Sequence, residues 1–236
     1  MSNYRILLFD VDDTLLDFGA AEKTALQLLF ANQQLVLTEE IAASYRIINK
    51  ELWRAFEEGK IEREEVLNTR FARLFKEMGI EADGVLLERK YREYLQEGHV
   101  RMEGAYELLS SLQKDYQLYV VTNGVSNTQD KRLRDSGLYP FFQSVFVSET
   151  AGYQKPMKEF FDYVFARIPH FSKASTLIIG DSLSSDIQGG QLAGIDTCWY
   201  NPFQHSNHMP HKPTYEIQKL EQLHEVLKKT TVYETR

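Results

Sequence analysis

Cysteine is almost absent from this chain, and long apolar runs are missing altogether. Cys198 is the single cysteine among 236 residues. One cysteine excludes a disulfide framework and fits a reducing, cytoplasmic compartment, where we expect it to be a buried structural thiol. No apolar run approaches the ~18 residues that a membrane-spanning helix needs. The first apolar segment starts within a few residues of Met1, which leaves no room for a signal peptide and predicts no association with a membrane.

Concentrated positive charge is also lacking. The chain has 27 Lys and Arg against 34 Asp and Glu, a formal net charge of −7. Because no segment forms a basic patch, we expect no binding to a long nucleic acid. A few local cations together with a metal ion can still hold a small anion. A small phosphorylated metabolite therefore remains a possible partner.

The most informative segment is an apolar run at residues 6–9 that is followed at once by acidic residues. Such a run predicts a strand buried on both faces of a parallel sheet. Asp10 and Asp12 stand two positions apart, so they face the same side of an extended backbone. Crowded carboxylates resist ionisation unless a cation lies among them, and oxygen ligands of this kind suit Mg²⁺. The alternative interpretation is a solvated acidic turn after a strand.

Residues 17–99 have the sequence pattern of a helical bundle. Apolar residues recur at helical spacing without a convincing strand, and Gly59 and Gly79 are placed to end helices. Thr38 precedes two glutamates and is a predicted N-cap. The expected helices cover residues 20–32, 39–58, 63–78 and 86–96. We predict that residues 17–99 form a separate small all-helical domain inserted after the first strand of a core built from residues 1–16 and 100–236.

Helices and strands alternate in the rest of the chain. The expected strands are residues 118–121, 144–147, 176–179 and 195–200, with an edge strand at 215–217. The expected helices are residues 105–114, 127–136, 157–168, 185–193 and 220–228. This alternation predicts an α/β fold with a Rossmann-like parallel sheet covered on both faces. In such sheets, ligands bind outside the carboxyl ends of the strands.

Polar side chains fall at those carboxyl ends. Thr122 and Asn123 follow the strand at 118–121, and Asp181 follows the strand at 176–179. Lys155 precedes one helix and Asp186 lies just inside another. If the sheet forms, these groups meet Asp10 and Asp12 at one edge. Carboxylates, a hydroxyl, an amide and a lysine together are suited to binding a metal ion and a phosphate ester.

Four motifs in this order resemble those of haloacid dehalogenase-like hydrolases. They are DVDDT at residues 10–14, the apolar strand that ends in Thr122-Asn123-Gly124, Lys155-Pro156, and Gly180-Asp181 followed by Asp186. The resemblance covers essentially the whole chain, including a helical cap after the first motif. Any one motif alone carries little weight, whereas four in sequence are specific.

The resemblance implies a phosphatase that works through an aspartyl-phosphate. Asp10 would be the nucleophile, and Asp12 would act first as general acid and then as general base. Mg²⁺ would be held by Asp10, the backbone carbonyl of Asp12, and Asp181. Asp13 would be structural and face away from the other two carboxylates. Carbon–halogen cleavage needs no acid two residues after the nucleophile, so Asp12 favours phosphoryl transfer.

The remaining motif residues would serve the phosphate. Thr122 and the backbone at Asn123 would grip its oxygens, and Lys155 would offset the charge on Asp10 and the phosphoryl group. Asp186 would orient the metal shell or Lys155. Each has a plainer alternative: a strand-end turn for Thr122, a surface position for Lys155, and a helix N-terminal acid for Asp186.

The beginning FDVDDTL and the later CWYN resemble bacterial pyrimidine 5′-nucleotidases of this family. This implies hydrolysis of nucleoside 5′-monophosphates, with a sugar phosphate or another small phosphomonoester as the alternative. A receiver-like regulatory module also carries a phosphoaccepting aspartate. The acidic loop directly after the nucleophile, and the helical insertion that follows it, argue against a receiver.

Two further groups of residues are candidates for binding. Aromatic and arginine side chains in the cap could contact the substrate or could belong to the helical core: Phe18, Trp53, Arg54, Phe56, Arg63, Arg70 and Phe71. His205, His208 and His211 could form a metal site or lie in a solvated loop. The prolines at positions 202 and 210 favour the loop.

Overall fold

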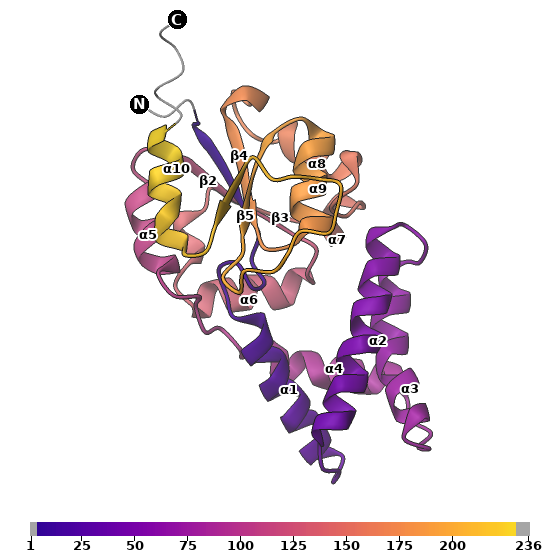
Figure 1. The fold of residues 1–236 in the computed structure, drawn as a ribbon. Helices are drawn as coiled ribbons and strands as arrows, with labels where there is room; N and C mark the ends of the chain where they lie inside the picture. Colours follow the sequence, from indigo (N-terminus) through magenta and orange to yellow (C-terminus); the bar gives the residue numbers. More distant parts are fainter. Residues whose placement is uncertain (1–3, 230–236) are drawn as a thin grey trace, which may run out of the picture. The chain divides into compact units, whose positions relative to one another are not determined.

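The computed structural model describes residues 4–229 and contains a six-stranded parallel sheet (Figure 1). The strand order is β3-β2-β1-β4-β5-β6. The strands are β1 (Ile6–Phe9), β2 (Gln117–Thr122), β3 (Ser144–Val147), β4 (Thr176–Gly180), β5 (Asp196–Tyr200) and β6 (Tyr215–Ile217). Every neighbouring pair is parallel. The predicted α/β class and parallel sheet are therefore confirmed.

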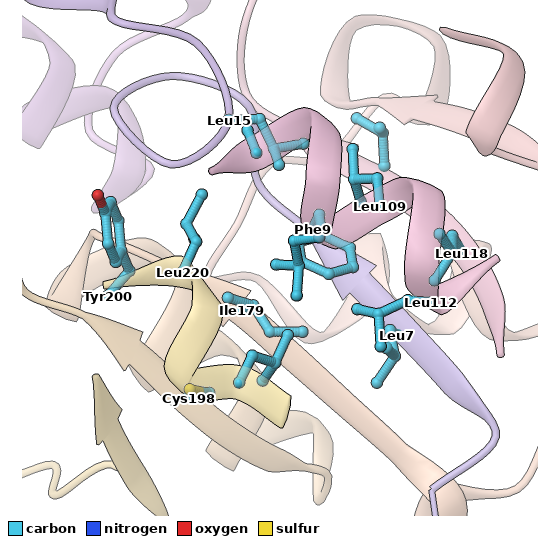
Figure 2. Close-up of a cluster of buried hydrophobic side chains, with 14 of the residues drawn as sticks. Leu7, Phe9, Leu15, Leu109, Leu112, Leu118, Ile179, Cys198, Tyr200 and Leu220 are labelled. Carbon is cyan, nitrogen blue, oxygen red and sulfur yellow. The ribbon is translucent and has the colours of Figure 1, made fainter. Parts of the chain in front are cut away.

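Strand β1 lies between β2 and β4, and both of its faces are buried. Leu7 and Phe9 pack on one face, in the cluster that Figure 2 shows with Leu109 and Leu112 of the helix α5 (Ala105–Leu112). Ile6 and Leu8 alternate with them and pack on the opposite face. Burial on both faces explains why the strand reads as one continuous apolar run.

Helices cover each face of the sheet (Figure 1). Residues of α5, α6 (Ser126–Asp135) and α10 (Leu223–Lys229) belong to one apolar cluster, and residues of α8 (Lys158–Phe165) and α9 (Gln188–Ala193) belong to the other. The helix predicted at residues 185–193 differs in form. A single π-helical turn, Leu183–Ile187, precedes α9. This wide turn carries Asp186.

A second compact unit spans Phe18–Gly98, and the rest of the described chain forms the first unit. The helices of the second unit are α1 (Phe18–Asn32), α2 (Glu39–Glu57), α3 (Arg63–Glu77) and α4 (Gly84–Leu95). Thr38 caps α2 by accepting a hydrogen bond from the Ile41 amide at 3.3 Å. Gly59 and Gly79 follow the ends of α2 and α3 with φ of 67° and 74°, a conformation that favours glycine.

Three of the cap residues considered as substrate contacts belong to the interior of this helical unit. Phe56 and Phe71 lie in its apolar cluster, and Arg70 is 2 % exposed. The Arg70 guanidinium donates two hydrogen bonds of 2.7 Å to the Glu88 carboxylate and one of 2.9 Å to the Asn49 side chain. For these three residues the core interpretation is the right one.

No helix within residues 4–229 combines the length and the apolar character that crossing a membrane requires.

Candidate active site

Lys155 is buried between two carboxylates. Its ammonium nitrogen donates to Oδ1 of Asp10 at 2.6 Å, to Oδ1 of Asp186 at 2.7 Å and to the carbonyl oxygen of Val121 at 2.8 Å. These bonds use all three ammonium hydrogens, and the residue is only 1 % exposed. Burial opposes its charge, but Asp10 and Asp186 outweigh that cost and raise the pKa of Lys155. The surface interpretation of Lys155 is therefore wrong.

Both oxygens of Asp186 are held by the protein. Oδ1 accepts from Lys155, and Oδ2 accepts from the Ser182 backbone amide at 3.1 Å. A Cβ atom at Gly180 would lie 2.2 Å from Asp186 Oδ2, so only glycine leaves room for this carboxylate. With no exposed surface, Asp186 is not a solvated acid at a helix N-terminus. The arrangement favours the predicted role of orienting Lys155.

Asp10, Asp181 and Asp186 form an acidic group. Among residues 4–229, they are the only three carboxylate, imidazole or thiol side chains with potential ligand atoms within 4.8 Å of one another. Burial raises the pKa of Asp10 to about 8; Lys155 opposes this shift, and Asp186 and Asp12 add to it. The pKa of Asp181 is raised well above its ordinary value, first by burial and then by the negative charges of Asp10 and Asp186. An all-oxygen set with so much unfavourable charge fits a hard divalent cation such as Mg²⁺.

Two contacts fix Asp181 at the end of β4. The Thr14 hydroxyl donates to Asp181 Oδ1 at 3.2 Å, and the indole nitrogen of Trp199 donates to the Asp181 carbonyl oxygen at 2.8 Å. Thr14 comes from the DVDDT segment and Trp199 from the neighbouring strand β5. These contacts join the first and last motifs at one edge of the sheet.

The Asn123 side chain serves the protein backbone. Its Nδ2 donates to the Lys155 carbonyl oxygen at 2.9 Å, and its Oδ1 accepts from the Lys155 amide at 2.9 Å. The side chain therefore holds the lysine segment against the end of β2. This leaves only the backbone of Asn123 for the predicted contact with phosphate. Thr122 is buried beside it, 1 % exposed.

Asp12 is held from helix α6. Gln129 Nε2 donates to Asp12 Oδ2 at 2.7 Å, and Arg132 Nη1 donates to Asp12 Oδ1. Sequence reasoning missed both residues. The sequence did contain a signal for such contacts, because the predicted helix at 127–136 has a strongly polar composition. When such a helix packs on a core, the polar side chains on its buried face need polar partners. Asp13 has a φ of 56°, which bends the backbone of the acidic loop.

The three histidines do not form a comparable group. His205 and His208 are exposed in an irregular loop, and His211 Nδ1 lies 3.1 Å from Gln191 Oε1. Their side chains are absent from the only three-ligand group among residues 4–229. The exposure of His205 and His208 favours the solvated-loop interpretation.

The carboxyl edge of the parallel sheet thus carries a buried Asp–Lys–Asp arrangement, and comparison with known proteins identifies the class of protein to which it belongs. The family model for haloacid dehalogenase-like hydrolases matches residues 7–200, so the chain belongs to this family. The predicted family is confirmed.

Three relatives match almost end to end. The haloacid dehalogenase-like (HAD) hydrolase YfnB of Bacillus subtilis is 63 % identical over 96 % of this chain and 97 % of its own. Its magnesium-bound crystal structure has a TM-score of 0.91, covering 95 % of this chain and 98 % of that one. The pyrimidine 5′-nucleotidase PynA of Streptococcus pneumoniae is 46 % identical over 96 % of each chain. The pyrimidine 5′-nucleotidase YjjG of Escherichia coli is 30 % identical over 94 % of this chain and 96 % of its own.

Proposed function

We propose that this protein is a Mg²⁺-dependent phosphomonoester hydrolase that acts on nucleoside 5′-monophosphates. The observation that carries the proposal is the buried carboxylate of Asp10, held by Lys155 at 2.6 Å beside the acidic group that it forms with Asp181 and Asp186. The substrate class is supported by two relatives of nearly equal length, both pyrimidine 5′-nucleotidases.

The first half of the reaction transfers the phosphoryl group to the protein. A carboxylate oxygen of Asp10 attacks phosphorus, the bond from phosphorus to the ester oxygen breaks, and Asp12 gives a proton to the departing oxygen. The product is a free alcohol and an aspartyl-phosphate on Asp10. Lys155 keeps Asp10 in place and offsets negative charge as the two anions approach.

The second half regenerates the protein. A water molecule attacks phosphorus, Asp12 takes the proton from that water, and the acyl phosphate bond breaks to release inorganic phosphate. Asp10 is again a carboxylate and Asp12 is again protonated. The Thr122 hydroxyl and the backbone at Asn123 are suited to holding the phosphate oxygens in both halves.

Asp10, Asp181 and the backbone carbonyl of Asp12 would hold Mg²⁺. When bound there, the ion would neutralise part of the charge that Asp10 and the phosphate bring together. Asp186 is occupied by Lys155 and Ser182, so its part is to position rather than to ligate.

A substrate panel with purified full-length protein tests the proposal. We expect Mg²⁺-dependent, repeated release of phosphate from nucleoside 5′-monophosphates and from p-nitrophenyl phosphate, and none in excess chelator. Release from sugar phosphates but from no nucleotide would remove the nucleotidase assignment and keep the phosphatase. A single turnover that leaves a stable phosphoprotein would instead indicate a receiver-like module.

A further inference from the structure

A single helix holds the Asp12 side chain through two buried donors. Gln129 Nε2 lies 2.7 Å from Asp12 Oδ2, and Arg132 Nη1 donates to Asp12 Oδ1. Gln129 is 1 % exposed and Arg132 has no exposed surface, whereas the Asp12 side chain is 28 % exposed. The donors lie behind the carboxylate, and the carboxylate itself still reaches solvent. Neither Gln129 nor Arg132 takes part in the reaction as described above.

The amide orientation of Gln129 follows from the chemistry of Arg132. Gln129 Oε1 lies 3.1 Å from Arg132 Nη1, and a guanidinium can only donate, so the oxygen of the amide must face it. The amide nitrogen therefore faces the other way. Its two hydrogens are directed to Asp12 Oδ2 at 2.7 Å and to Thr122 Oγ1 at 3.1 Å.

The same amide determines what the Thr122 hydroxyl can do. Thr122 Oγ1 accepts from Gln129 Nε2 and from the Gly124 backbone amide, each at 3.1 Å. A hydroxyl has two acceptor lone pairs and one donor hydrogen, so both lone pairs are used and the hydrogen remains to donate. A phosphate oxygen is an acceptor. The hydroxyl is thereby prepared for an anion.

We infer that Gln129 and Arg132 are positioning residues that orient the proton-transferring group and a phosphate-binding group together. The inference rests on the proposed phosphatase function and extends it to two residues of α6. Arg132 sets the Gln129 amide, and the amide directs both the Asp12 carboxylate and the Thr122 hydroxyl. Since a misplacement of about 1 Å can cost about 100-fold in rate, losing the amide should affect catalysis strongly.

Gly124 provides the space in which the Gln129 side chain lies. A Cβ atom at Gly124 would come within 2.3 Å of Gln129 Nε2 and 2.7 Å of its Cγ. Alanine at this position must therefore push the amide away from Asp12 and Thr122. Gly124→Ala is a second, independent way to disturb the same contacts without changing either positioning residue.

The test compares Gln129→Leu, Gln129→Glu and Gly124→Ala with the wild-type protein. Arg132→Gln is paired with Arg134→Gln, a matched control, because Arg134 lies on the same helix with a side chain 53 % exposed and pairs with Asp130. The substrates are thymidine 5′-monophosphate, whose alkoxide needs a proton to leave, and p-nitrophenyl phosphate, whose phenolate does not. Acid quenching and mass spectrometry measure the steady-state fraction of phosphorylated Asp10.

We expect kcat for thymidine 5′-monophosphate to fall about 100-fold in the two Gln129 variants and in Gly124→Ala. With p-nitrophenyl phosphate, phosphorylation of Asp10 persists while hydrolysis of the intermediate slows, so the phosphorylated fraction should rise above that of wild type. Inhibition by inorganic phosphate should weaken, because Thr122 is no longer oriented. Arg132→Lys, which still only donates, should retain more activity than Arg132→Gln.

Two results would overturn the inference. One is wild-type kinetics in folded Gln129→Leu and Gly124→Ala. The other is an equal loss on both substrates with no accumulated phosphoprotein and unchanged inhibition by phosphate, which would mean a purely structural role. If the wild-type protein hydrolyses no phosphate ester, the proposed function fails separately. In that case, calorimetric titration with inorganic phosphate still tests the orientation of Thr122. Equal phosphate affinities of wild type and Gln129→Leu would contradict it.

Discussion

The Lys155 ammonium nitrogen lies 2.6 Å from Oδ1 of Asp10, although 145 positions separate the two residues in the chain. The same nitrogen reaches Asp186 at 2.7 Å. One buried cation thus lies between two buried carboxylates, and Asp181 adds a third to the group. When all three carboxyls are ionised and no metal ion is bound, their negative charge exceeds the single positive charge of Lys155. The first three predictions depend on this imbalance or on the acidic loop beside it.

Substitutions in the acidic loop should separate nucleophile from acid. Asp10→Asn should abolish turnover, because an amide does not form the phosphoenzyme. Asp12→Asn should lower kcat on a nucleotide by about 10²–10⁴-fold and leave a phosphorylated or sluggish protein. Phosphate release and intact-protein mass measure both effects.

Asp13→Asn is the matched control for this loop. It makes the same change of charge one position further on, at a φ of 56° that asparagine tolerates. We expect its kcat to stay within about threefold of wild type, since no chemical step uses Asp13. Full activity of Asp10→Asn, with or without full activity of Asp12→Asn, would disprove the mechanism.

Removing the buried lysine should destabilise the core. Lys155→Met leaves Asp10 and Asp186 without their cation, and breaking a buried pair in this way costs about 3–5 kcal/mol. Urea unfolding at neutral pH in chelator measures the loss.

Lys158→Met is the comparison for that experiment. Lys158 is 58 % exposed and pairs with Asp162 on the surface of α8, so we expect a change below about 0.5 kcal/mol. If Lys155→Met and Lys158→Met unfold at the same urea concentration, Lys155 is not buried between charges as the structure shows.

Stability in the absence of metal should fall as pH rises. Burial raises the pKa of Asp10 to about 8 in the folded state, against an ordinary value of 3.8, and the pKa of Asp181 is also raised. Between these values the folded state binds more protons than the unfolded state, so raising the pH favours unfolding. Mg²⁺ should therefore increase Tm more near the upper end of this window than near the lower end, as thermal denaturation in Mg²⁺ or chelator would show.

Asp181→Asn provides the test of that linkage. It removes one charge from the group while keeping an oxygen to accept from Thr14. We expect a higher Tm in chelator at the alkaline end, a weaker dependence on pH, little response to Mg²⁺, and no turnover. A Tm of wild type that is independent of pH and of Mg²⁺ would contradict the acidic site.

The helical cap should depend on one buried ion pair. Glu88 accepts from Arg70 at 2.7 Å and from Arg92 at 2.8 Å, and its side chain is 5 % exposed. Glu88→Gln leaves the buried Arg70 charge without its carboxylate, at a cost of about 3 kcal/mol. Hydrogen exchange should show faster exchange of α3 and α4 amides.

Glu93→Gln is the control in the same helix. Glu93 is 50 % exposed and pairs with Lys90 at 2.9 Å, so its loss should leave exchange nearly unchanged. Equal protection in Glu88→Gln and Glu93→Gln would show that the Arg70–Glu88 pair does not stabilise the cap.

Local patterns predicted much of this molecule. The apolar run at residues 6–9 indicated a strand buried on both faces, and the structure places it between β2 and β4. The helical stripes, Thr38 and the two glycines indicated helices α1 to α4, with ends displaced by one or two residues. These features depend on neighbours along the chain, so periodicity and capping preferences are enough to find them. The four ordered motifs also indicated the family, which is confirmed.

Contacts between distant residues were decided by the tertiary structure. Asn123 could be assigned to a strand end, but its clamp on the Lys155 backbone requires both segments in place. Gln129 and Arg132 carry no motif, and their contacts with Asp12 exist because α6 packs against the sheet beside the acidic loop. Arg70 was a candidate substrate contact because of its residue type, but in the structure it is buried and paired with Glu88. Residue type and spacing name the groups that perform chemistry, whereas the packing of separate elements determines which partner each group meets and how that partner orients it.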